Sequence, residues 1–336
     1  MAKTIGLISA NYTIENFSEA QAERGLAAMP FGGRYRLIDF PLSNMSASGV
    51  KSVGIIMPFN NRSLIDHVGT GAAWGFGRKT HSLFMLPGSV YGKRNNKGKF
   101  LLRDFMGNRR FLEYEDVENV IMTSCSRIFS MDFRPLIEEH EKSGANITRV
   151  YKGTEFMDCF VINREFFLNV LDWFSNLDFM DLNEIIDRYL PDTKTGRYEF
   201  TGYSRGIDDI KDYYRANMDL LDENVQHMLF DCGVTICTNI QDRCPTFYAP
   251  GAQVKNSLVA AGCVIEGKVE NSIIFRSTVV EKGAAVKNCV LMQHAIIKKN
   301  SSVEYFICDK RVTVREGAVV HGSEENPCWA GKGEII

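Results

Sequence analysis

Short apolar runs alternate with stretches of helical periodicity along the first two-thirds of this chain. Four runs have the length and composition of buried strands: residues 3–10, 53–57, 117–123 and 146–151. Residues 133–143 and 182–190 instead place apolar side chains on one helical face, and Gly144 and Pro191 stop these two helices. Strands that alternate with helices predict right-handed βαβ units around a mostly parallel sheet.

A longer helical pattern covers residues 208–224, where Ile210, Tyr213, Tyr214 and Leu221 recur at helical spacing. The helical periodicity then stops over residues 229–250, which we interpret as a linker. These features predict that residues 1–228 form one α/β domain.

From residue 251 onward the apolar positions repeat every six residues. The strict repeat runs through Ile273, Val279, Ala285, Leu291, Ile297 and Val303. Hexapeptide repetition is typical of the left-handed parallel β-helix, in which each unit forms one side of a coil and points its aliphatic residue inward. An antiparallel sandwich would alternate every two residues instead. We therefore expect a β-helix of about four coils over residues 251–336, with a C-terminal tail.

Composition argues against several classes of partner. The chain has 336 residues and a formal net charge of −2, which gives no field to attract nucleic acid or an anionic membrane. No apolar run approaches the ~20 residues that span a bilayer, and the N-terminal residues lack the pattern of a signal peptide. The nine cysteines form no Cys-x-x-Cys pair. We expect a cytoplasmic protein with reduced thiols, no metal site, no nucleic-acid partner and no membrane contact.

Three segments carry a resemblance to a known family. Residues 30–44 read PFGGRYRLIDFPLSN, residues 128–133 read IFSMDF and residues 215–221 read RANMDLL. With the predicted β-helix, they resemble the ADP-glucose pyrophosphorylases (glucose-1-phosphate adenylyltransferases) of bacterial glycogen synthesis over nearly the whole chain. The resemblance implies a Rossmann-like, GT-A-type nucleotidyltransferase domain ahead of the β-helix. It also implies a reaction of ATP with glucose 1-phosphate that needs carboxylate-held Mg²⁺.

Other residues stand at the positions where this family holds its substrates. The Gly-rich phosphate loop after the first strand is replaced by SANYTIENF at residues 9–17, and no glycine lies between Gly6 and Gly25. The lysine of the family's R-A-K-P motif falls on Leu26. In the sugar-phosphate region Phe156 stands at the position of a serine, and the preceding E-K-P hairpin is missing.

The two metal-binding carboxylates that the resemblance implies are also replaced. Ser126 stands where the family's S-G-D-H motif has its aspartate, with Arg127 beside it, and Gly206 stands for the aspartate of G-Y-W-K-D. A serine hydroxyl and a glycine are poor substitutes for carboxylate ligands of Mg²⁺. Asp208 or Asp209 is an alternative ligand, although both also fit a helix N-cap and its first turn.

We therefore hypothesise a catalytically inactive, regulatory subunit similar to the D-type (GlgD-type) chains of this family. No catalytic residue, metal or cofactor is expected in this chain, and Mg²⁺ is implied only for a catalytic partner. The family implies a heterotetramer with that catalytic ADP-glucose pyrophosphorylase subunit. We expect an anionic sugar-phosphate effector at Arg34, which aligns with a basic position of the family, with Arg36 and Arg24 extending the site.

Two alternatives stay open at this stage. The chain is an active nucleotidyltransferase if Asp208 or Asp209, together with Asp132, rebuilds the metal site. It is a hexapeptide acyltransferase if His294 or His321 serves as a base, or a scaffold if the repeats only support assembly.

Overall fold

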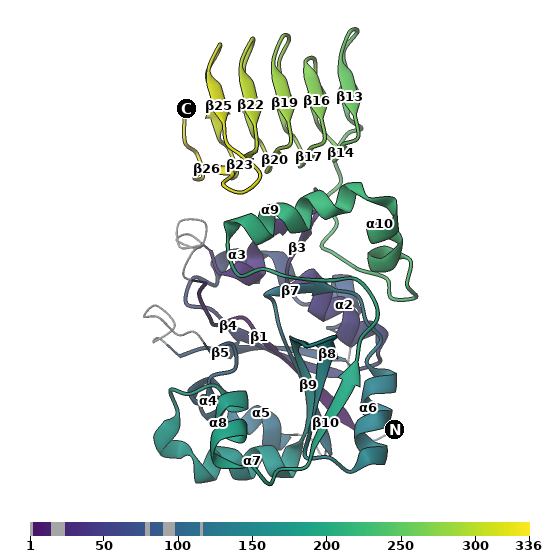
Figure 1. The fold of residues 1–336 in the computed structure, drawn as a ribbon, viewed down its shortest axis with the longest axis vertical. Coiled ribbons are helices and arrows are strands. Elements are labelled where there is room, and N and C mark those ends of the chain that lie inside the picture. Colours follow the sequence, from purple (N-terminus) through teal and green to yellow (C-terminus); the bar gives the residue numbers. More distant parts are fainter. Residues whose placement is uncertain (1–2, 15–23, 78–80, 90–97, 115–116) are drawn as a thin grey trace.

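The computed structural model describes residues 3–14, 24–77, 81–89, 98–114 and 117–336. Two domains are stacked along the long axis of the molecule, an α/β domain and a β-helix (Figure 1). The expected fold class is confirmed, because a mostly parallel sheet is followed by three sheets of parallel strands, the arrangement of a left-handed β-helix.

The α/β domain is built on a seven-stranded sheet with the order β10-β8-β9-β6-β1-β4-β5. Its strands are β1 (Thr4–Ser9), β4 (Ser52–Met57), β5 (Ser82–Pro87), β6 (Asn119–Ser124), β8 (Ile147–Lys152), β9 (Glu155–Asn163) and β10 (Thr195–Glu199). Only β9 runs antiparallel to its neighbours. The four strands predicted from apolar runs are β1, β4, β6 and β8, each within two residues at either end.

Helices cover both faces of this sheet because its central strands are apolar on both sides. On one face α2 (Asp39–Ala47), α3 (Arg62–Val68) and α6 (Arg134–Ser143) share a core with Ile8 and Val53. On the other face α4 (Leu102–Gly107), α5 (Arg109–Tyr114), α7 (Arg164–Trp173) and α8 (Leu182–Tyr189) share a core with Leu7 and Ile56. The predicted helices over 133–143 and 182–190 are α6 and α8, and α6 ends as expected at Gly144 (φ 59°).

The helix predicted over residues 208–224 is two helices in the structure, which corrects that expectation. α9 spans Ile210–Met218, a single 3-10 turn follows, and α10 spans Glu223–Phe230. The break lies at Asp222, whose backbone is extended (φ −87°, ψ 121°) and whose carboxylate accepts a hydrogen bond from a backbone N–H of the new helix at 2.8 Å. An aspartate in this geometry is an N-cap, so the chain starts a second helix there.

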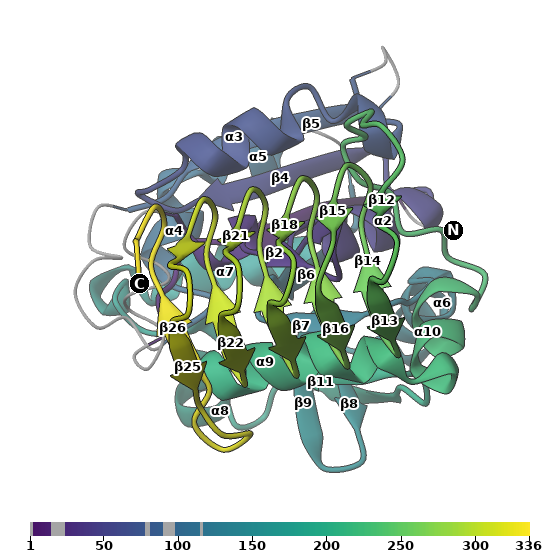
Figure 2. The same ribbon diagram turned by 90° about the horizontal axis from the view of Figure 1, so that it is seen from above.

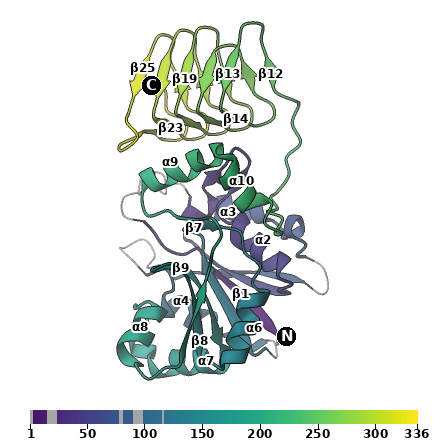
Figure 3. The ribbon, with the colours of Figure 1, turned by 45° about the vertical axis from the view of Figure 1, so that its right-hand side comes forward.

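Three five-stranded parallel sheets form the β-helix, so it has five rungs where about four were expected (Figure 2). The first sheet holds β12 (Phe247–Tyr248), β15 (Val264–Ile265), β18 (Val279–Val280), β21 (Ile296–Ile297) and β24 (Thr313–Val314). The second holds β13 (Gln253–Lys255), β16 (Lys268–Glu270), β19 (Ala285–Lys287), β22 (Ser302–Glu304) and β25 (Val319–His321). The third holds β14 (Leu258–Val259), β17 (Ile273–Ile274), β20 (Val290–Leu291), β23 (Phe306–Cys308) and β26 (Cys328–Ala330). The chain runs from α10 up one side of the molecule to β12, so the first rung begins inside the range 229–250 expected as a linker (Figure 3).

The central coils, between residues 273 and 314, are shorter than three hexapeptides, which shifts the inward-pointing positions there. Residues paired between neighbouring rungs are 17 apart in Ile273↔Val290 and Val279↔Ile296. Fully buried residues accordingly follow at steps of six, six and five: Ile274, Val280, Val286, Leu291, Ile297, Val303 and Cys308. The short steps span corners at which Asn288 and Tyr305 adopt left-handed backbone angles (φ 52° and 49°). Val279 and Ala285, expected to point inward, are therefore only half-buried.

An apolar cluster joins the two domains. Tyr213 on α9 lies in one buried cluster with Phe275 and Val290 of the β-helix. Beside it, Tyr214 donates a hydrogen bond from its hydroxyl to the carbonyl oxygen of Asn288 at 2.9 Å. Because buried apolar surface holds the β-helix against α9, the side chains that border this junction keep a fixed arrangement.

The nine cysteines are all free thiols in the structure. Within the described ranges, no helix combines the length and the apolar character that crossing a membrane would require.

Candidate functional site

Side chains fill the space after β1 where the family resemblance places a phosphate loop. Asn11 directs its amide nitrogen at both carboxylate oxygens of Asp104, at 3.0 and 3.1 Å. Tyr12 is buried, and its hydroxyl accepts a hydrogen bond from the backbone N–H of Cys125 at 2.9 Å. Burial raises the pKa of Tyr12 well above its ordinary value, so the phenol stays neutral. The start of the loop is thus a packed cluster, and residues 15–17 of the expected loop lie outside the described residues.

Ser126, the first of the two metal positions, is fully buried. Its hydroxyl lies 2.9 Å from Ser124 Oγ and donates a hydrogen bond to Asp158 Oδ2 at 3.1 Å. Asp158 also accepts a hydrogen bond from Lys99 Nζ at 2.6 Å. Ser126 is therefore one member of a hydrogen-bonded chain and supplies no anionic oxygen for Mg²⁺.

Gly206, the second metal position, faces an arginine. It lies on β11 (Ser204–Gly206), which pairs antiparallel with β7 (Arg127–Phe129) so that Gly206 is opposite Arg127. A Cβ atom at residue 206 would lie 3.1 Å from Arg127 Nη2. The buried guanidinium also donates a hydrogen bond to Ser204 Oγ at 3.0 Å and pairs with Glu155. A cation thus borders the place of the second carboxylate, and the residues at these two positions do not fit a divalent metal ion.

The three aspartates proposed as alternative metal ligands, Asp132, Asp208 and Asp209, each contact a different protein group. Asp209 caps α9 by accepting a hydrogen bond from a backbone N–H at 2.7 Å. Asp132 accepts hydrogen bonds from the Arg134 guanidinium, the closest at 2.6 Å. Asp208 lies 3.6 Å from Lys99 Nζ. In the ranges that the structure describes, no three histidine, cysteine, aspartate or glutamate side chains are grouped to hold a metal ion.

The two remaining family positions are apolar and packed. Leu26 begins a 3-10 turn (Leu26–Ala28) and is buried in the cluster that contains Phe31. The ring of Phe156 on β9 lies 5.7 Å from that of Tyr151 and 6.4 Å from that of Phe160, measured between centroids. Neither side chain offers a charge or a hydrogen bond to a phosphate group.

A hollow of about 510 Å³ at the domain junction has a large excess of positive charge. We call it the basic cavity. Its cationic lining residues are Arg34, Arg36, Arg62, Arg276, Lys310, Arg311 and Lys332, and the one carboxylate among its described lining residues is Asp66. The first three cations come from the α/β domain and the other four from the β-helix. Two of the three predicted effector residues, Arg34 and Arg36, are therefore brought together here.

The fold holds two arginines of the basic cavity in place. Arg36 donates hydrogen bonds from Nη1 to the carbonyl oxygen and the hydroxyl of Ser63 at 2.6 and 2.8 Å, and burial lowers its pKa to about 10. Arg276 donates from Nη2 to the Arg34 carbonyl oxygen at 3.2 Å. Burial, together with Arg34 and Arg243 nearby, lowers the pKa of Arg276. The buried Nε of Arg276 and Oε1 of Gln293 have no hydrogen-bond partner within the described structure, so the cavity keeps polar atoms to offer a ligand.

Arg24, the third predicted effector residue, does not line the basic cavity. It is buried and forms an ion pair with Asp309 of the β-helix, which is buried as well. The pair links positions 285 residues apart in the sequence and joins the two domains.

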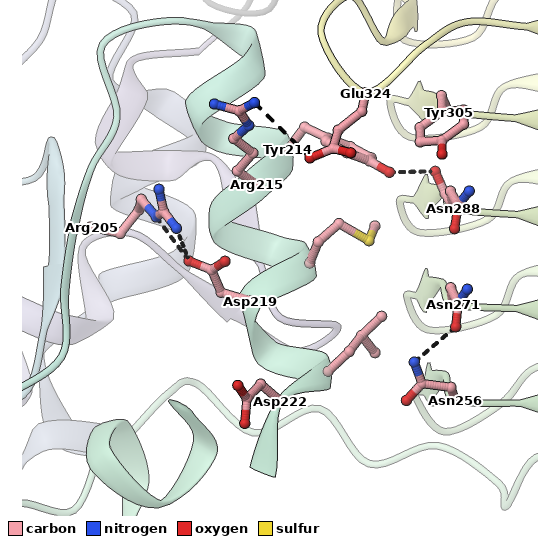
Figure 4. A pocket seen from close by; sticks show the side chains of 12 residues that line it. Arg205, Tyr214, Arg215, Asp219, Asp222, Asn256, Asn271, Asn288, Tyr305 and Glu324 are labelled. Atoms are coloured by element: carbon pink, nitrogen blue, oxygen red, sulfur yellow. Dashed lines mark hydrogen bonds and ion pairs between the residues drawn. The ribbon is translucent and has the colours of Figure 1, made fainter. Parts of the chain in front are cut away.

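A separate groove of about 730 Å³ lies between α9 and the asparagine corners of the β-helix (Figure 4). Both of its arginines pair with carboxylates, because Arg205 contacts Asp219 at 2.6 Å and Arg215 contacts Glu325 at 2.7 Å. The groove therefore lacks the excess of positive charge that distinguishes the basic cavity.

The four β-helix cations of the basic cavity were not predicted, although the spacing of the residues at their corner indicates that they stack. Arg276, Gln293 and Lys310 follow one another at intervals of 17 residues, and so do His294 and Arg311. This interval is the length of the coil, so these residues stack at one corner of successive rungs. The strict six-residue pattern hides the alignment because it implies a coil of 18. Tyr12 was missed because a lone tyrosine carries no pattern. Lys99 was missed because it ends the basic run KRNNKGK at residues 93–99, which is typical of a solvated surface loop.

The fold and the site define a nucleotidyltransferase-type α/β domain joined to a hexapeptide β-helix. Residues 23–158 match the family described as nucleotidyl transferase, and residues 248–326 match the family described as GlmU-like, C-terminal hexapeptide. The second match begins at β12, in agreement with the first rung of the structure.

Comparison with proteins that align with most of this chain identifies one family within this class. The chain is 31% identical to the glycogen biosynthesis protein GlgD of Bacillus subtilis (strain 168) over 98% of this chain and 96% of the relative. It is 32% identical to GlgD of Geobacillus stearothermophilus over 84% and 83% of the two chains. It is 29% identical to the glucose-1-phosphate adenylyltransferase of Clostridium perfringens (strain 13 / Type A) over 81% and 78%. The chain belongs to the family of GlgD proteins and glucose-1-phosphate adenylyltransferases.

Proposed function

We propose that this chain is a regulatory, catalytically inactive subunit of glucose-1-phosphate adenylyltransferase in glycogen biosynthesis. The observation that carries the proposal is the pair of metal positions, Ser126 and Gly206, which lack carboxylates and border the cations Lys99 and Arg127. The filled loop at Asn11 supports it as well, because a triphosphate needs exposed backbone N–H groups and room. Its GlgD relatives are named for glycogen biosynthesis, which supports the metabolic role.

The rate of ADP-glucose formation tests this function directly. Initial rates are measured with ATP, glucose 1-phosphate and Mg²⁺ for the catalytic relative from the same organism, with and without this chain, and for this chain alone. We expect no turnover by the chain alone and a changed rate or effector response in the mixture. Turnover by the chain alone that is lost in Asp208→Ala would favour the alternative of displaced metal ligands.

We also propose that the basic cavity binds the anionic sugar-phosphate effector of the assembled enzyme. Seven basic side chains against one carboxylate favour a multiply charged anion, and arginine is well suited to phosphate because its guanidinium donates two parallel hydrogen bonds. Both domains contribute cations, so a bound anion would link them and favour one arrangement of the junction.

The effector site is tested in the mixture with Arg34→Ala and Arg276→Met. Arg197→Met is a matched control, because this arginine is exposed and lies over the Tyr151 ring, away from the basic cavity. We expect the two cavity variants to raise the concentration of glucose 1,6-bisphosphate that gives half-maximal response by about tenfold or more, with no change in the control. An unchanged response in all three variants would place the effector elsewhere.

Assembly with the catalytic subunit is part of the proposal, and the family implies a heterotetramer. Light scattering of the mixed chains, after separation by size, measures the mass of the complex. Two separate species at micromolar concentration would contradict a stable complex.

A further inference from the structure

A lysine ammonium lies between two carboxylates at the position where the family resemblance implies a metal ion. Lys99 Nζ is 2.6 Å from Asp158 Oδ2 and 3.6 Å from Asp208 Oδ1. The same oxygen of Asp158 accepts the hydrogen bond of Ser126, at 3.1 Å. The ammonium thus takes part in one cluster with the residue that replaces the family's metal-binding aspartate.

The protein backbone positions both members of the closer pair. The carbonyl oxygen of Lys99 accepts a hydrogen bond from the hydroxyl of Ser9, at the end of β1. Asp158 lies on β9 with a left-handed backbone angle (φ 50°), which aspartate tolerates better than most side chains. The side chains of Lys99 and Asp158 are only 23% and 13% exposed, so the carboxylate has limited access to water. An unpaired carboxylate would be costly at this place, and the lysine neutralises it.

We propose that Lys99 is a built-in cation that substitutes for the divalent metal ion of the family's catalytic site. The cluster then consists of the Lys99 ammonium, the Asp158 carboxylate and the Ser126 hydroxyl, with Asp208 at its exposed edge. Lys99 neutralises the Asp158 carboxylate without a metal ion, so the site stays closed to Mg²⁺. This inference deepens the proposed function, since it names what replaces the metal in a chain that lacks the metal ligands.

The proposal predicts that removing the ammonium opens the site to a divalent ion. Mn²⁺ is the probe, because it accepts the oxygen ligands that suit Mg²⁺ and its paramagnetic resonance signal reports the free ion. We expect the natural chain to bind Mn²⁺ only weakly, with a dissociation constant in the millimolar range or above. We expect Lys99→Met to bind Mn²⁺ about tenfold or more tightly than the natural chain. Adding Asp158→Asn to Lys99→Met removes the carboxylate and should abolish the gain.

Thermal unfolding gives a second readout that does not depend on activity. Lys99→Met should lower the melting temperature by about 3 °C or more without metal, and millimolar Mn²⁺ should restore it. Lys287→Met is the matched control, because Lys287 also pairs with a carboxylate, Glu304, at 3.1 Å. Mn²⁺ should not stabilise this control or the natural chain.

Two results would overturn the inference. One is that Lys99→Met binds Mn²⁺ no more tightly than the natural chain, and the other is that Lys287→Met gains as much affinity as Lys99→Met. If Lys99→Met does not fold, Lys99→Gln takes its place, because its amide still donates a hydrogen bond to Asp158 but carries no charge. The outcome is separate from that of the rate measurement. If the natural chain shows no turnover and the Lys99 variants do not bind Mn²⁺ more tightly, only the role of Lys99 is contradicted. Turnover by the natural chain would instead contradict the proposed function.

Discussion

Lys310 is the residue of the basic cavity whose charge changes near neutral pH. Burial, with the nearby cations Arg36 and Arg24, lowers its pKa to about 7. A lysine in an unfolded chain titrates near pH ~10.4, so the folded state binds fewer protons between these two values. Without a ligand, the contribution of Lys310 to stability therefore rises with pH across this window. The affinity of the cavity for an anion should depend on pH in the opposite direction. It falls as the pH rises, because only the protonated Lys310 attracts an anion.

We expect the basic cavity to bind sulfate more tightly as the pH falls from about 8 to about 6. Sulfate stays divalent over this range, so the change reports the protein. Besides the six other basic residues, the titratable groups that line the cavity with Lys310 are Tyr35, Asp66, His67 and His294. Burial and the neighbouring cations lower the pKa of His294, which places its titration below that of an ordinary histidine.

Calorimetric titration of sulfate into three proteins measures this dependence. The natural chain should show the rise in affinity, Lys310→Met should show a much weaker one, and Lys310→Arg should bind tightly at both ends of the range. A pH dependence that survives in Lys310→Arg would assign the titration to another group, such as His294.

At the scale of the elements, the β-helix depends on corners that ordinary side chains do not favour. Asn256, Asn271 and Asn288 have φ values of 42°, 45° and 52° at successive corners. Asparagine tolerates these positive φ values because its short side-chain amide can form hydrogen bonds with nearby backbone groups. Glycine tolerates them because it has no Cβ. The sequence pattern Asn-Ser or Asn-Cys at these corners therefore indicates a left-handed backbone conformation as well as a polar surface.

We expect Asn288→Ala to lower the free energy of unfolding by about 1 kcal/mol and Asn288→Gly to change it much less. The carbonyl oxygen of Asn288 accepts the Tyr214 hydrogen bond, and both variants keep that acceptor. Urea denaturation followed by circular dichroism gives the two values. Equal losses in both variants would show that the side-chain amide matters rather than the backbone angle.

Sequence periodicity predicted several elements of the α/β domain and the repeat of the β-helix, but not the breaks within these patterns. Four of the seven strands of the α/β sheet, β1, β4, β6 and β8, were located within two residues because each is an apolar run that is largely buried on both faces. The strands β5, β9 and β10 were not predicted. The break between α9 and α10 was missed, because Met218, Leu220 and Leu221 continue the helical spacing while Asp222 caps a new helix. The five-residue step of the β-helix was missed for a related reason. The amino-acid sequence shows a strict six-residue repeat of aliphatic residues through Val279 and Ala285, whereas the residues paired between these rungs are 17 apart.

At the scale of the whole molecule, the ion pair between Arg24 and Asp309 ties the domains together. Both side chains are buried, with exposed fractions of 3% and 5%. Removing one partner of such a pair leaves the other charge without compensation, whereas removing both costs less.

We expect Arg24→Met to lower the free energy of unfolding by about 3–5 kcal/mol, measured by urea denaturation. The double variant Arg24→Met with Asp309→Asn should recover a large part of this loss. An asparagine oxygen at 309 still accepts the hydrogen bond that Asp309 receives from the Lys310 backbone N–H at 2.6 Å. If the double variant folds well yet loses sulfate affinity, Arg24 also contributes to the effector site, as the sequence predicted.

The sequence by itself determined the two domain types, the family and the replaced positions Ser126, Gly206, Leu26 and Phe156, because these depend on local pattern and on the identity of single residues. It also selected Arg34 and Arg36, which do line the basic cavity. Only the tertiary structure decided which cations join them, since Arg276 and Lys310 reach the cavity through the stacking of 17-residue coils. It alone placed the Lys99 ammonium against Asp158, 59 residues away. Contacts between distant segments depend on how sheets and coils pack, and that packing is the product of many weak apolar contacts that no single motif records.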